Sequence, residues 1–382
     1  MKKQTFHDLG KIKIFLIIKS LGRGGAENLL VETLRLINRE KFEFEVAYFL
    51  PNKNQMVRQI NNLDVPVHCF NIASNLEILL NRKCLISYIT RKKFDIIHAH
   101  LPWAGIAARM VTSRIDSPVI YTEHNMQERY HPVTRLINKL TFNHQKEVFA
   151  VSNEVLSSVQ KNIKPSIPVS LLLNGVDTEK YKPTNSATLD LRAKLRIKNG
   201  DLIIGTVAVF RKQKRLDIWL KLALRIHNEF PNTFFLILGD GPEGAKIRRI
   251  IKKSNLRSIC LPGRLSEVAE WVSLMDIFMI TSKHEGLPIA LLEAMSMKTP
   301  IVTTDAGGIK EIVRNGIEGF IYPVDQWSDM INGLRELIVD GELRIRIGDS
   351  ARKRICENFS LANMVSQLET HYLRIADDCS NN

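Results

Sequence analysis

The feature that most constrains the fold is an alternation of short apolar runs with helical patterns, which occurs twice along the chain. The first series of candidate strands is Ile12–Ile18, Phe44–Leu50, Asp95–His98, Val119–Thr122, Val148–Val151 and Val169–Leu173. The second series is Leu202–Ala208, Thr233–Leu238, Ser258–Leu261, Ile277–Ile280, Ile301–Thr304 and Gly319–Ile321. Helical patterns fill the gaps, for example at 26–38, 104–111, 216–229 and 289–297. This alternation predicts parallel sheets covered by helices on both faces, and the strands are too many for one ordinary open sheet.

A domain boundary is expected in the polar, turn-rich stretch 174–198, between the two series. We therefore predict an α/β protein with two doubly wound, Rossmann-like domains facing a cleft. Residues 1–180 form the first domain and residues 181–360 the second, while residues 361–382 form a C-terminal helix that packs back toward the N-terminal domain. Since such sheets bind ligands at the carboxyl ends of their strands, the site is sought in the loops that follow them.

Composition excludes several protein classes. Hydrophobic residues make up 45% of the chain and charged residues 25%, which is ordinary for a globular protein. No apolar run approaches the roughly 18 residues of a membrane span. The run 12–18 contains Lys13 and precedes no small-residue cleavage site, so we expect a buried strand there and not a signal peptide. The five cysteines form no C-x-x-C pair, which argues against a disulfide framework and a structural zinc site and favours a cytoplasmic location.

The net charge of +14 favours an anionic partner. Nucleic acid, a phosphorylated ligand and the acidic inner face of a membrane all fit this charge. Because no helix-turn-helix, zinc or RNP-type signature is present, no nucleic acid is expected. The segment 76–94 has the pattern of one basic helix, with two interpretations: it rests on an anionic membrane, or it covers the sheet with a solvated basic end. Its apolar residues are Leu76, Leu79, Leu80, Ile86 and Ile89, beside Arg82, Lys83, Arg91, Lys92 and Lys93.

The loop after the first strand of each series carries a phosphate-binding pattern. In the first, Gly24 and Gly25 open a helix, where glycine lets the backbone approach a phosphate and the helix N-terminus offers free N–H groups. The stretch is neither a G-x-G-x-x-G motif nor a P-loop, and a plain tight turn is the alternative. In the second, the cations of Phe210–Arg215 predict a polyanion clamp, with a solvated basic loop as the alternative.

The most informative stretch runs from Glu285 to Met295 and reads Glu-Gly-Leu-Pro-Ile-Ala-Leu-Leu-Glu-Ala-Met. Pro288 suits the first turn of a helix, so Glu285 lies just before that helix and Glu293 about two turns into it. Two such carboxylates can each take a different hydroxyl pair of one sugar nucleotide, while the helix N-terminus favours a diphosphate. A capping Glu285 and a surface Glu293 are the alternative.

Three histidines end neighbouring strands of the first series. His98 and His100 share one face of their strand, and since no third metal ligand is evident, a structural or hydrogen-bonding role is expected. His124 ends the next strand, where a parallel sheet places its active site, so it is the leading histidine of the site.

Taken together, these motifs resemble the retaining, GT-B-fold glycosyltransferases of family 4. The resemblance covers nearly the whole chain, from the glycines at 24–25 to about residue 323. Further matching stretches are Asn174-Gly-Val-Asp177, Gly239-Asp-Gly-Pro242, Pro262-Gly-Arg264 and Asp305-Ala-Gly-Gly308, together with Glu311 and Gly316.

The resemblance implies a set of site residues. The donor-binding residues would be Gly24, Gly25, Arg211, Lys214, Arg264, Leu265, Glu285, Gly286, Leu287 and Glu293. Glu285 would bind hydroxyls of the donor sugar and Glu293 the ribose, while Lys214 and Gly25 would lie at the diphosphate. Arg264 and Leu265 would lie near the base. His124 and Glu285 would be the catalytic residues, with His124 contacting the donor sugar near the reacting centre.

One departure from the family concerns the phosphates. Similar members read Gly-Arg-Leu before the lysine, whereas this chain reads Ala208-Val209-Phe210, so the phosphate-gripping arginine is missing. Arg211 or Arg215 is expected to replace it.

The function implied by the resemblance is metal-independent, retaining transfer of a hexosyl group from a nucleotide-sugar, expected to be a UDP-sugar. The acceptor would be a hydroxyl of a glycan or lipid-linked molecule in cell-surface polysaccharide assembly. No D-x-D motif is present, no cofactor is expected, and an anionic membrane surface is a further expected partner, with the protein cytoplasmic or peripheral on the inner membrane face. The alternatives are a nucleotide-sugar epimerase or phosphorylase on the same fold, an inactive subunit, and a basic nucleic-acid-binding protein.

Overall fold

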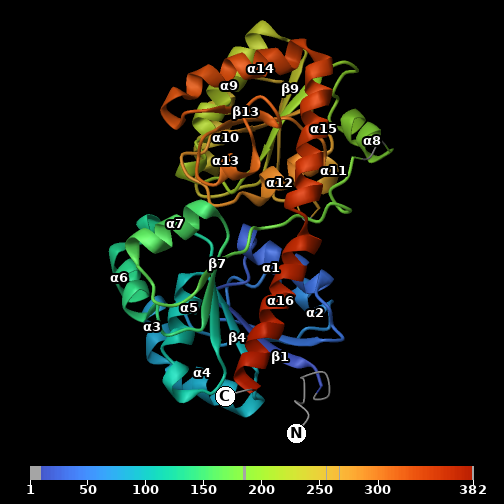
Figure 1. Cartoon of the computed structure of the whole chain (residues 1–382). Helices are drawn as coiled ribbons and strands as arrows, with labels where there is room; N and C mark the ends of the chain where they lie inside the picture. Colours follow the sequence, from blue (N-terminus) through green and yellow to red (C-terminus); the bar gives the residue numbers. More distant parts are fainter. Residues whose placement is uncertain (1–9, 184–185, 255, 266, 381–382) are drawn as a thin grey trace. The chain divides into compact units, whose positions relative to one another are not determined.

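A computed structural model describes residues 10–183, 186–254, 256–265 and 267–380, which form two compact units (Figure 1). Unit 1 runs to Asn174 and resumes at Leu361, and unit 2 is Gly175–Ser360. The division falls at 174/175, whereas the sequence analysis placed it at 180/181. Thr184 and Asn185, in the expected linker, lie outside the described residues.

Unit 1 is built on a seven-stranded parallel sheet in the order β3-β2-β1-β4-β5-β6-β7. Its strands are β1 Ile12–Ile18, β2 Phe42–Tyr48, β3 Val67–Cys69, β4 Ile96–His100, β5 Val119–Glu123, β6 Glu147–Ala150 and β7 Val169–Leu171. All six runs of the first series contain a strand. The sequence analysis missed β3 because its three residues, Val-His-Cys, form no apolar run and are only half-buried.

The helices of unit 1 cover both faces of this sheet. They are α1 Gly25–Leu36, α2 Val57–Asn61, α3 Asn75–Leu80, α4 Arg82–Lys92, α5 Pro102–Arg109, α6 Pro132–Thr141, α7 Asn153–Asn162 and α16 Leu361–Ser380, with 3-10 turns η2 Thr112–Arg114 and η3 Gln127–Arg129. Alternate residues of β1 show the two faces, as the pleat of a strand requires. Phe15 and Ile17 pack into the core under α4 and α5, whereas Leu16 lines a cavity with residues of α1 and α16.

The prediction of one helix over 76–94 is wrong. Asn81 separates α3 from α4, and α4 turns Leu85 and Ile89 inward to cover the sheet. A continuous apolar surface therefore does not form, although Leu76 and Leu80 of α3 are 65% and 70% exposed.

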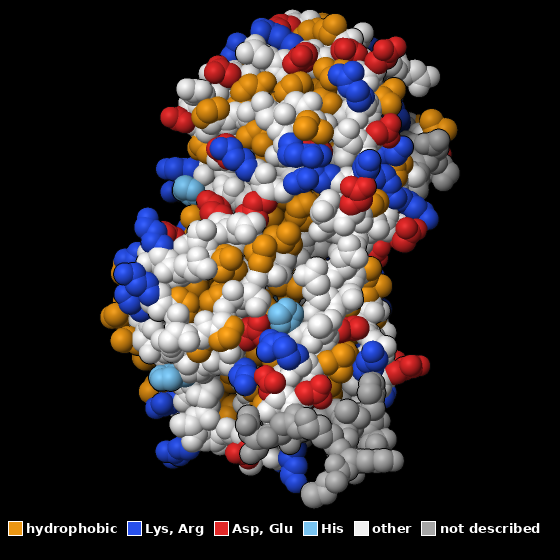
Figure 2. All heavy atoms as spheres, viewed as in Figure 1, with side chains coloured by type: hydrophobic (Ala, Val, Ile, Leu, Met, Phe, Trp, Pro, Cys, Tyr) orange, Lys and Arg blue, Asp and Glu red, His pale blue; other side chains and the backbone are white. Residues whose placement is uncertain are grey.

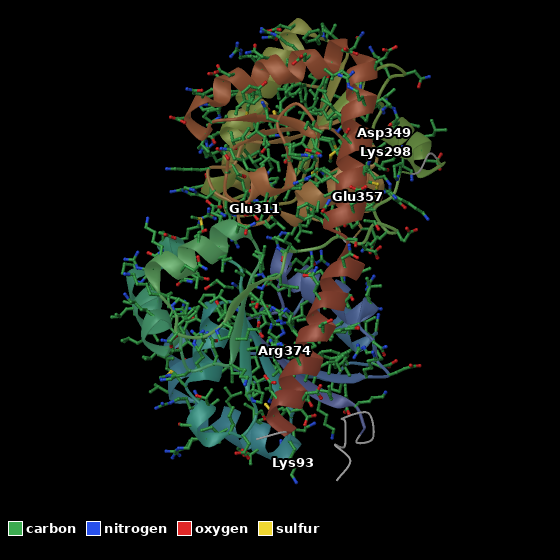
Figure 3. All side chains as sticks on the ribbon, viewed as in Figure 1. Lys93, Lys298, Glu311, Asp349, Glu357 and Arg374 are labelled. Carbon is green, nitrogen blue, oxygen red and sulfur yellow. The ribbon has the colours of Figure 1, made fainter. Side chains whose placement is uncertain are left out.

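The last helix, α16, packs on α1 and β4 within unit 1. The Tyr372 hydroxyl reaches the ring of His98, and Arg374, labelled in Figure 3, forms an ion pair with Glu147 of β6. The carboxylate of Glu369 accepts the backbone N–H of Asn38 at 2.7 Å. The helix is thereby tied to three separate parts of unit 1.

Unit 2 has a six-stranded parallel sheet in the order β10-β9-β8-β11-β12-β13. Its strands are β8 Leu202–Val207, β9 Thr233–Leu238, β10 Ile259–Gly263, β11 Ile277–Ile280, β12 Ile301–Thr304 and β13 Gly319–Tyr322. Its helices are α8 Ser186–Lys194, α9 Leu216–Glu229, α10 Gly244–Ser254, α11 Ala269–Val272, α12 Ile289–Ser296, α13 Ile309–Ile312, α14 Met330–Val339 and α15 Gly341–Asn358, with η4 Lys212–Lys214 and η5 Val324–Asp329. Lys298, just after α12, pairs with Asp349 of α15 at 2.7 Å, and both are labelled in Figure 3.

Both sheets reverse their winding at an inner strand pair, β1/β4 in unit 1 and β8/β11 in unit 2. This topological switch point is where open α/β sheets bind ligands, beyond the carboxyl ends of the strands. The prediction of two doubly wound, Rossmann-like domains is confirmed. Within the described ranges, no helix is both long enough and apolar enough to cross a bilayer.

Candidate active site

The loops that follow β8 and β11 in unit 2 are bound to each other. The backbone N–H of Lys283 donates to the carbonyl of Gln213 at 2.7 Å, and the hydroxyl of Thr281 donates to the carbonyl of Lys214 at 3.1 Å. These bonds exist because β8 and β11 are neighbours in the sheet. They bring two of the predicted donor-binding residues, Lys214 and Glu285, together at the switch point.

Lys214 and Glu285 form an ion pair. The ammonium Nζ lies 2.6 Å from the carboxylate Oε1, and the Glu285 side chain is only 8% exposed. Ser282 also donates its hydroxyl to Oε1. Among the described residues, Lys214 and Ser282 both donate to Oε1, and neither of them donates to Oε2. Burying a carboxylate is costly unless it is paired, so Lys214 is the group that makes a buried Glu285 tolerable here.

The segment from Glu285 to α12 is held by its neighbours in the sheet. The Thr304 hydroxyl donates to the Ser282 carbonyl at 2.6 Å, and the Gly308 N–H donates to the Gly286 carbonyl at 3.0 Å. Pro288, and not Glu285, is the N-cap residue of α12, and its own side chain makes no capping hydrogen bond. The alternative of a capping Glu285 is therefore wrong.

The segment contains three further predicted donor-binding residues, Gly286, Leu287 and Glu293. Leu287 is buried, and Gly286 is half-buried. Glu293 is half-buried and is the fifth residue of α12, one turn into the helix and not two. Glu293 lies closer to the helix start than predicted because α12 begins only at Ile289, directly after its N-cap residue Pro288.

The cations of the basic loop are held in different ways. Arg215 has a left-handed backbone (φ 49°) and donates its guanidinium to the carbonyl of Val324 at 2.8 Å. Arg211 is exposed to solvent. Of the two proposed replacements for the missing arginine, Arg211 is thus the more exposed residue.

The start of this loop is fixed by close backbone contact with the turn after β9. A Cβ on Gly241 would lie 2.7 Å from the backbone nitrogen of Phe210, so a larger residue would push the loop aside. Arg264 and Leu265 follow β10 at the same carboxyl edge of the sheet, where Arg264 is exposed and Leu265 half-buried.

In unit 1 the three predicted histidines form one cluster. The imidazole of His98 lies between the hydroxyls of Tyr372 (Nδ1, 2.6 Å) and Thr122 (Nε2, 2.7 Å). The His100 ring lies 4.2 Å from the His98 ring, and its Nδ1 is 3.3 Å from Nε2 of His124. His98 and His100 therefore share one face of β4, as their spacing predicted.

Burial sets the protonation of this cluster. Desolvation lowers the pKa of His98 to about 3, with repulsion from His124 adding to it, and lowers the pKa of His124 to about 4. Desolvation also holds the pKa of His100 well below its usual value. The three imidazoles are therefore neutral at pH 7, because burial deprives their charged forms of hydration by water.

The ring of His98 links two hydroxyls. Burial raises the pKa of Tyr372, so its hydroxyl keeps its proton. A neutral imidazole carries its proton on one ring nitrogen and accepts on the other, so one of the Tyr372 and Thr122 hydroxyls donates to the ring and the other accepts from it. His98 is thus a buried hydrogen-bonding link, as expected. Among the described residues, no three His, Cys, Asp or Glu side chains are grouped closely enough to hold a metal ion.

A cavity of about 40 Å³ joins this cluster to the start of α1. His100, His124 and Ala26 are among its lining residues. Gly24 is the N-cap residue of α1 and Gly25 its first residue, so the N-cap position itself provides no side-chain cap. The structure therefore brings the two predicted glycines close to the predicted histidine within unit 1.

Several residues of these clusters were not predicted as site residues. Ser282 could have been found from its spacing of three residues before Glu285. Tyr372 carried no local signal, because it reaches His98 from 274 residues away in the sequence.

Comparison with known proteins places both units in known families. Residues 23–180 match the family model described as Glycosyltransferase Family 4, and residues 188–354 match Glycosyl transferases group 1. The chain is 27% identical over 300 residues to N-acetyl-alpha-D-glucosaminyl L-malate synthase of Bacillus anthracis, covering 76% of this chain and 77% of that protein. It is 25% identical over 384 residues to UDP-Gal:alpha-D-GlcNAc-diphosphoundecaprenol alpha-1,3-galactosyltransferase of Escherichia coli, covering 95% and 97%.

The fold is also that of solved glycosyltransferase structures. HepE of Anabaena, solved in complex with UDP and glucose, superposes with a TM-score of 0.84 at 20% sequence identity, covering 94% of this chain and 99% of HepE. Together the two family models span most of the sequence, one covering mainly unit 1 and the other lying within unit 2. The chain therefore belongs to the family 4 glycosyltransferases, which have the GT-B fold and transfer glycosyl groups.

Proposed function

We propose that the protein transfers a hexosyl group, with retention of configuration, from a nucleotide-sugar to a hydroxyl of a glycan or lipid-linked acceptor. The observation that carries this proposal is the buried Lys214–Glu285 pair at the switch point of unit 2. A UDP-sugar is the preferred donor, which is supported by the UDP-galactose named for the Escherichia coli relative and the UDP bound by HepE. The diphosphoundecaprenol in the relative's name supports a lipid-linked acceptor in polysaccharide assembly.

In the proposed mechanism, unit 2 stabilises the leaving group. The bond between sugar and phosphate breaks with oxocarbenium character, so negative charge builds on the diphosphate. Lys214, Arg211 and the N-terminus of α12 provide the positive charge and N–H groups that stabilise it. Oε2 of Glu285 accepts hydroxyls of the donor sugar, and Glu293 accepts those of the ribose.

Residues of unit 1 complete the proposed mechanism. His124 contacts the donor sugar as a neutral imidazole, because its pKa lies near 4. Gly24 and Gly25 offer N–H groups at the start of α1 to the diphosphate. The acceptor attacks on the face that the diphosphate leaves, and the leaving phosphate takes the acceptor's proton, so no protein nucleophile is assigned.

Donor binding is the first test of this proposal. We expect one class among UDP-, GDP- and ADP-sugars to raise the melting temperature by about 2–5 °C at saturating concentration, since a ligand that binds only the native state stabilises it. Lys214→Met should remove most of this shift by deleting the ammonium at the diphosphate. Lys246→Met is the matched control, because that exposed lysine forms ion pairs with Asp217 and Glu243 and was not predicted as a donor-binding residue.

Each alternative function has its own outcome in the same experiment. No shift with any nucleotide would contradict the proposal and favour an inactive subunit. Conversion of the sugar nucleotide without an acceptor would indicate an epimerase. Salt-sensitive DNA binding without nucleotide binding would indicate a nucleic-acid-binding protein.

Metal independence is a separate prediction. We expect transfer to proceed unchanged in excess EDTA, because the proposal assigns the charge of the diphosphate to Lys214, Arg211 and the N-terminus of α12. The measurement is the initial rate with and without EDTA at a fixed donor concentration. Loss of activity that magnesium or manganese restores would refute this part of the mechanism.

A further inference from the structure

Helix α6 (Pro132–Thr141) of unit 1 is amphipathic in the reverse of the usual sense. A surface helix normally buries its apolar stripe and exposes its polar side. In α6 the two buried residues, Thr134 and Asn138, are polar, while Ile137 and Thr141 are half-buried. The apolar side chains of the helix lie mainly on its solvent side, so the inward contacts need a separate explanation.

The inward side of α6 is held by a buried hydrogen-bond network. Arg109 of α5, only 1% exposed, donates to the hydroxyl of Thr141 at 3.1 Å and to the side-chain oxygen of Asn138. Asn138 then donates to Gln127 at 2.8 Å, and Gln127 donates to Glu123 at 2.6 Å. A buried network of this kind requires polar partners from α6, which leaves its apolar residues to face outward.

The outward side of α6 carries an apolar stripe. Val133, Leu136 and Leu140 are 54%, 58% and 70% exposed, and their spacing of three and four residues places them on one side of the helix. Arg135 and Lys139 lie beside this stripe, four residues apart and both exposed. Within the described part of the chain, neither of these cations makes an ion pair.

The sequence around α6 is rich in cations. Residues 129–146 include Arg129, Arg135, Lys139 and Lys146 and no Asp or Glu, although Lys146 pairs with Asp378 of α16 at 3.6 Å and Glu128 directly precedes the stretch. A stripe of exposed leucines beside lysine and arginine is the pattern of helices that lie in the interface of an anionic bilayer.

Neighbouring elements extend this surface. Helices α3 and α6 both pack against α5, and α3 exposes Leu76 and Leu80. An open groove of about 510 Å³ lies between α4 and the turn after α5, and its charged lining residues are Lys83, Arg91 and Arg114. Figure 2 shows hydrophobic and basic side chains along the part of unit 1 where Figure 1 places α6, α3 and α4.

We propose that this surface, centred on the outward side of α6, docks the protein on a lipid bilayer that contains anionic lipids. The apolar stripe enters the interface while Arg135 and Lys139 contact the headgroup phosphates. A second copy of the chain is a poorer occupant, since a two-fold contact through α6 would bring its cations against each other. The inference deepens the proposed function, because a lipid-linked acceptor would be reached from such a surface.

The position of the surface is compatible with the proposed chemistry. Helix α5, on which α6 packs, lies on the face of the sheet that receives Phe15 and Ile17. His98, His100 and His124 line the cavity on the opposite face, beside α1 and α16. Docking through α6 therefore leaves the histidine cluster uncovered.

Flotation of the full-length protein with vesicles tests the proposal. We expect the wild type to float with vesicles of phosphatidylcholine and phosphatidylglycerol at low salt, and to float much less with pure phosphatidylcholine or at high salt. Leu136→Ser/Leu140→Ser should lower the bound fraction about tenfold, because it removes most of the inserted apolar area. Arg135→Glu/Lys139→Glu should also release the protein by repelling the lipid charge.

The matched control is Val339→Ser/Ile345→Ser, which removes two equally exposed apolar side chains (73% and 67%) from unit 2. It should float like the wild type. Wild-type protein that stays unbound, or a Leu136→Ser/Leu140→Ser variant that floats normally, would overturn the proposal. The proposal would also be overturned if light scattering showed the wild type to be a dimer and the Leu136→Ser/Leu140→Ser variant to be a monomer.

The readouts keep this inference separate from the proposed function. All four replaced residues of α6 are exposed, so the variants should keep the wild-type melting temperature. Flotation is scored without donor or acceptor, so its failure is distinct from a failure to bind nucleotides. Leu136→Ser/Leu140→Ser should keep the nucleotide-induced melting shift, and loss of that shift would show that α6 belongs to the donor site and overturn the assignment of α6 as a lipid surface.

Discussion

Replacing Glu285 by glutamine is expected to lower kcat of glycosyl transfer about a thousandfold while leaving the protein folded. Glutamine keeps the shape and can still accept from Ser282, but it removes the negative charge that positions the Lys214 ammonium at 2.6 Å. The lysine then loses its orientation, and the donor hydroxyls lose a charged acceptor. Losses of two to three orders of magnitude are typical when one charged or hydrogen-bonding group that stabilises a transition state is removed. The measurement is the initial rate at saturating donor, with the melting temperature recorded alongside.

The matched control is Glu318→Gln. Glu318 is a fully buried carboxylate of unit 2, and it is paired with Arg314 four residues earlier. Its replacement should lower the melting temperature and leave the turnover of the folded protein unchanged. Wild-type turnover in Glu285→Gln would remove Glu285 from the proposed site, and equal losses in both variants would show that the effect is one of folding.

Acid is expected to destabilise unit 1 through its neutral histidines. The folded-state pKa of His98 is about 3, below the value near 6.5 of an exposed histidine. Between these two pH values the unfolded chain therefore binds a proton at His98 and the folded chain does not. The stability is fully present above pH 6.5 and falls as the pH drops toward 3. By pH 4.5 this residue alone should cost about 3 kcal/mol of the free energy of unfolding. His124 and His100 shift in the same direction and add to the loss.

Urea unfolding at a series of pH values from 7.5 to 4.5 measures this effect. His98→Gln should flatten the pH dependence by about one proton, since glutamine can accept from Tyr372 and donate to Thr122 without titrating. His144→Gln is the control, because it makes the same replacement at an exposed histidine of unit 1 outside the cluster. Identical slopes in wild type and His98→Gln would contradict the assignment of His98 as a buried neutral group.

The sequence alone determined the fold class of this protein. Strands that are buried on both faces read as continuous apolar runs, so β1 and β9 were visible with their full bounds. The same rule explains the missed β3, whose three half-buried residues carry no such run. The sequence also located Lys214, Glu285 and His124 at the ends of strands, because the alternation of strands and helices shows where each strand ends.

Only the tertiary structure decided how these residues are paired. Lys214 and Glu285 meet because β11 lies beside β8, although two other strands separate them in the sequence. Tyr372 reaches His98 because α16 returns to unit 1 after the whole of unit 2. Which side of α6 faces the protein depends in the same way on Arg109, because its buried guanidinium donates hydrogen bonds to the polar side of the helix. Local periodicity shows that a helix has two sides, but which side is buried depends on what the rest of the chain places beneath it.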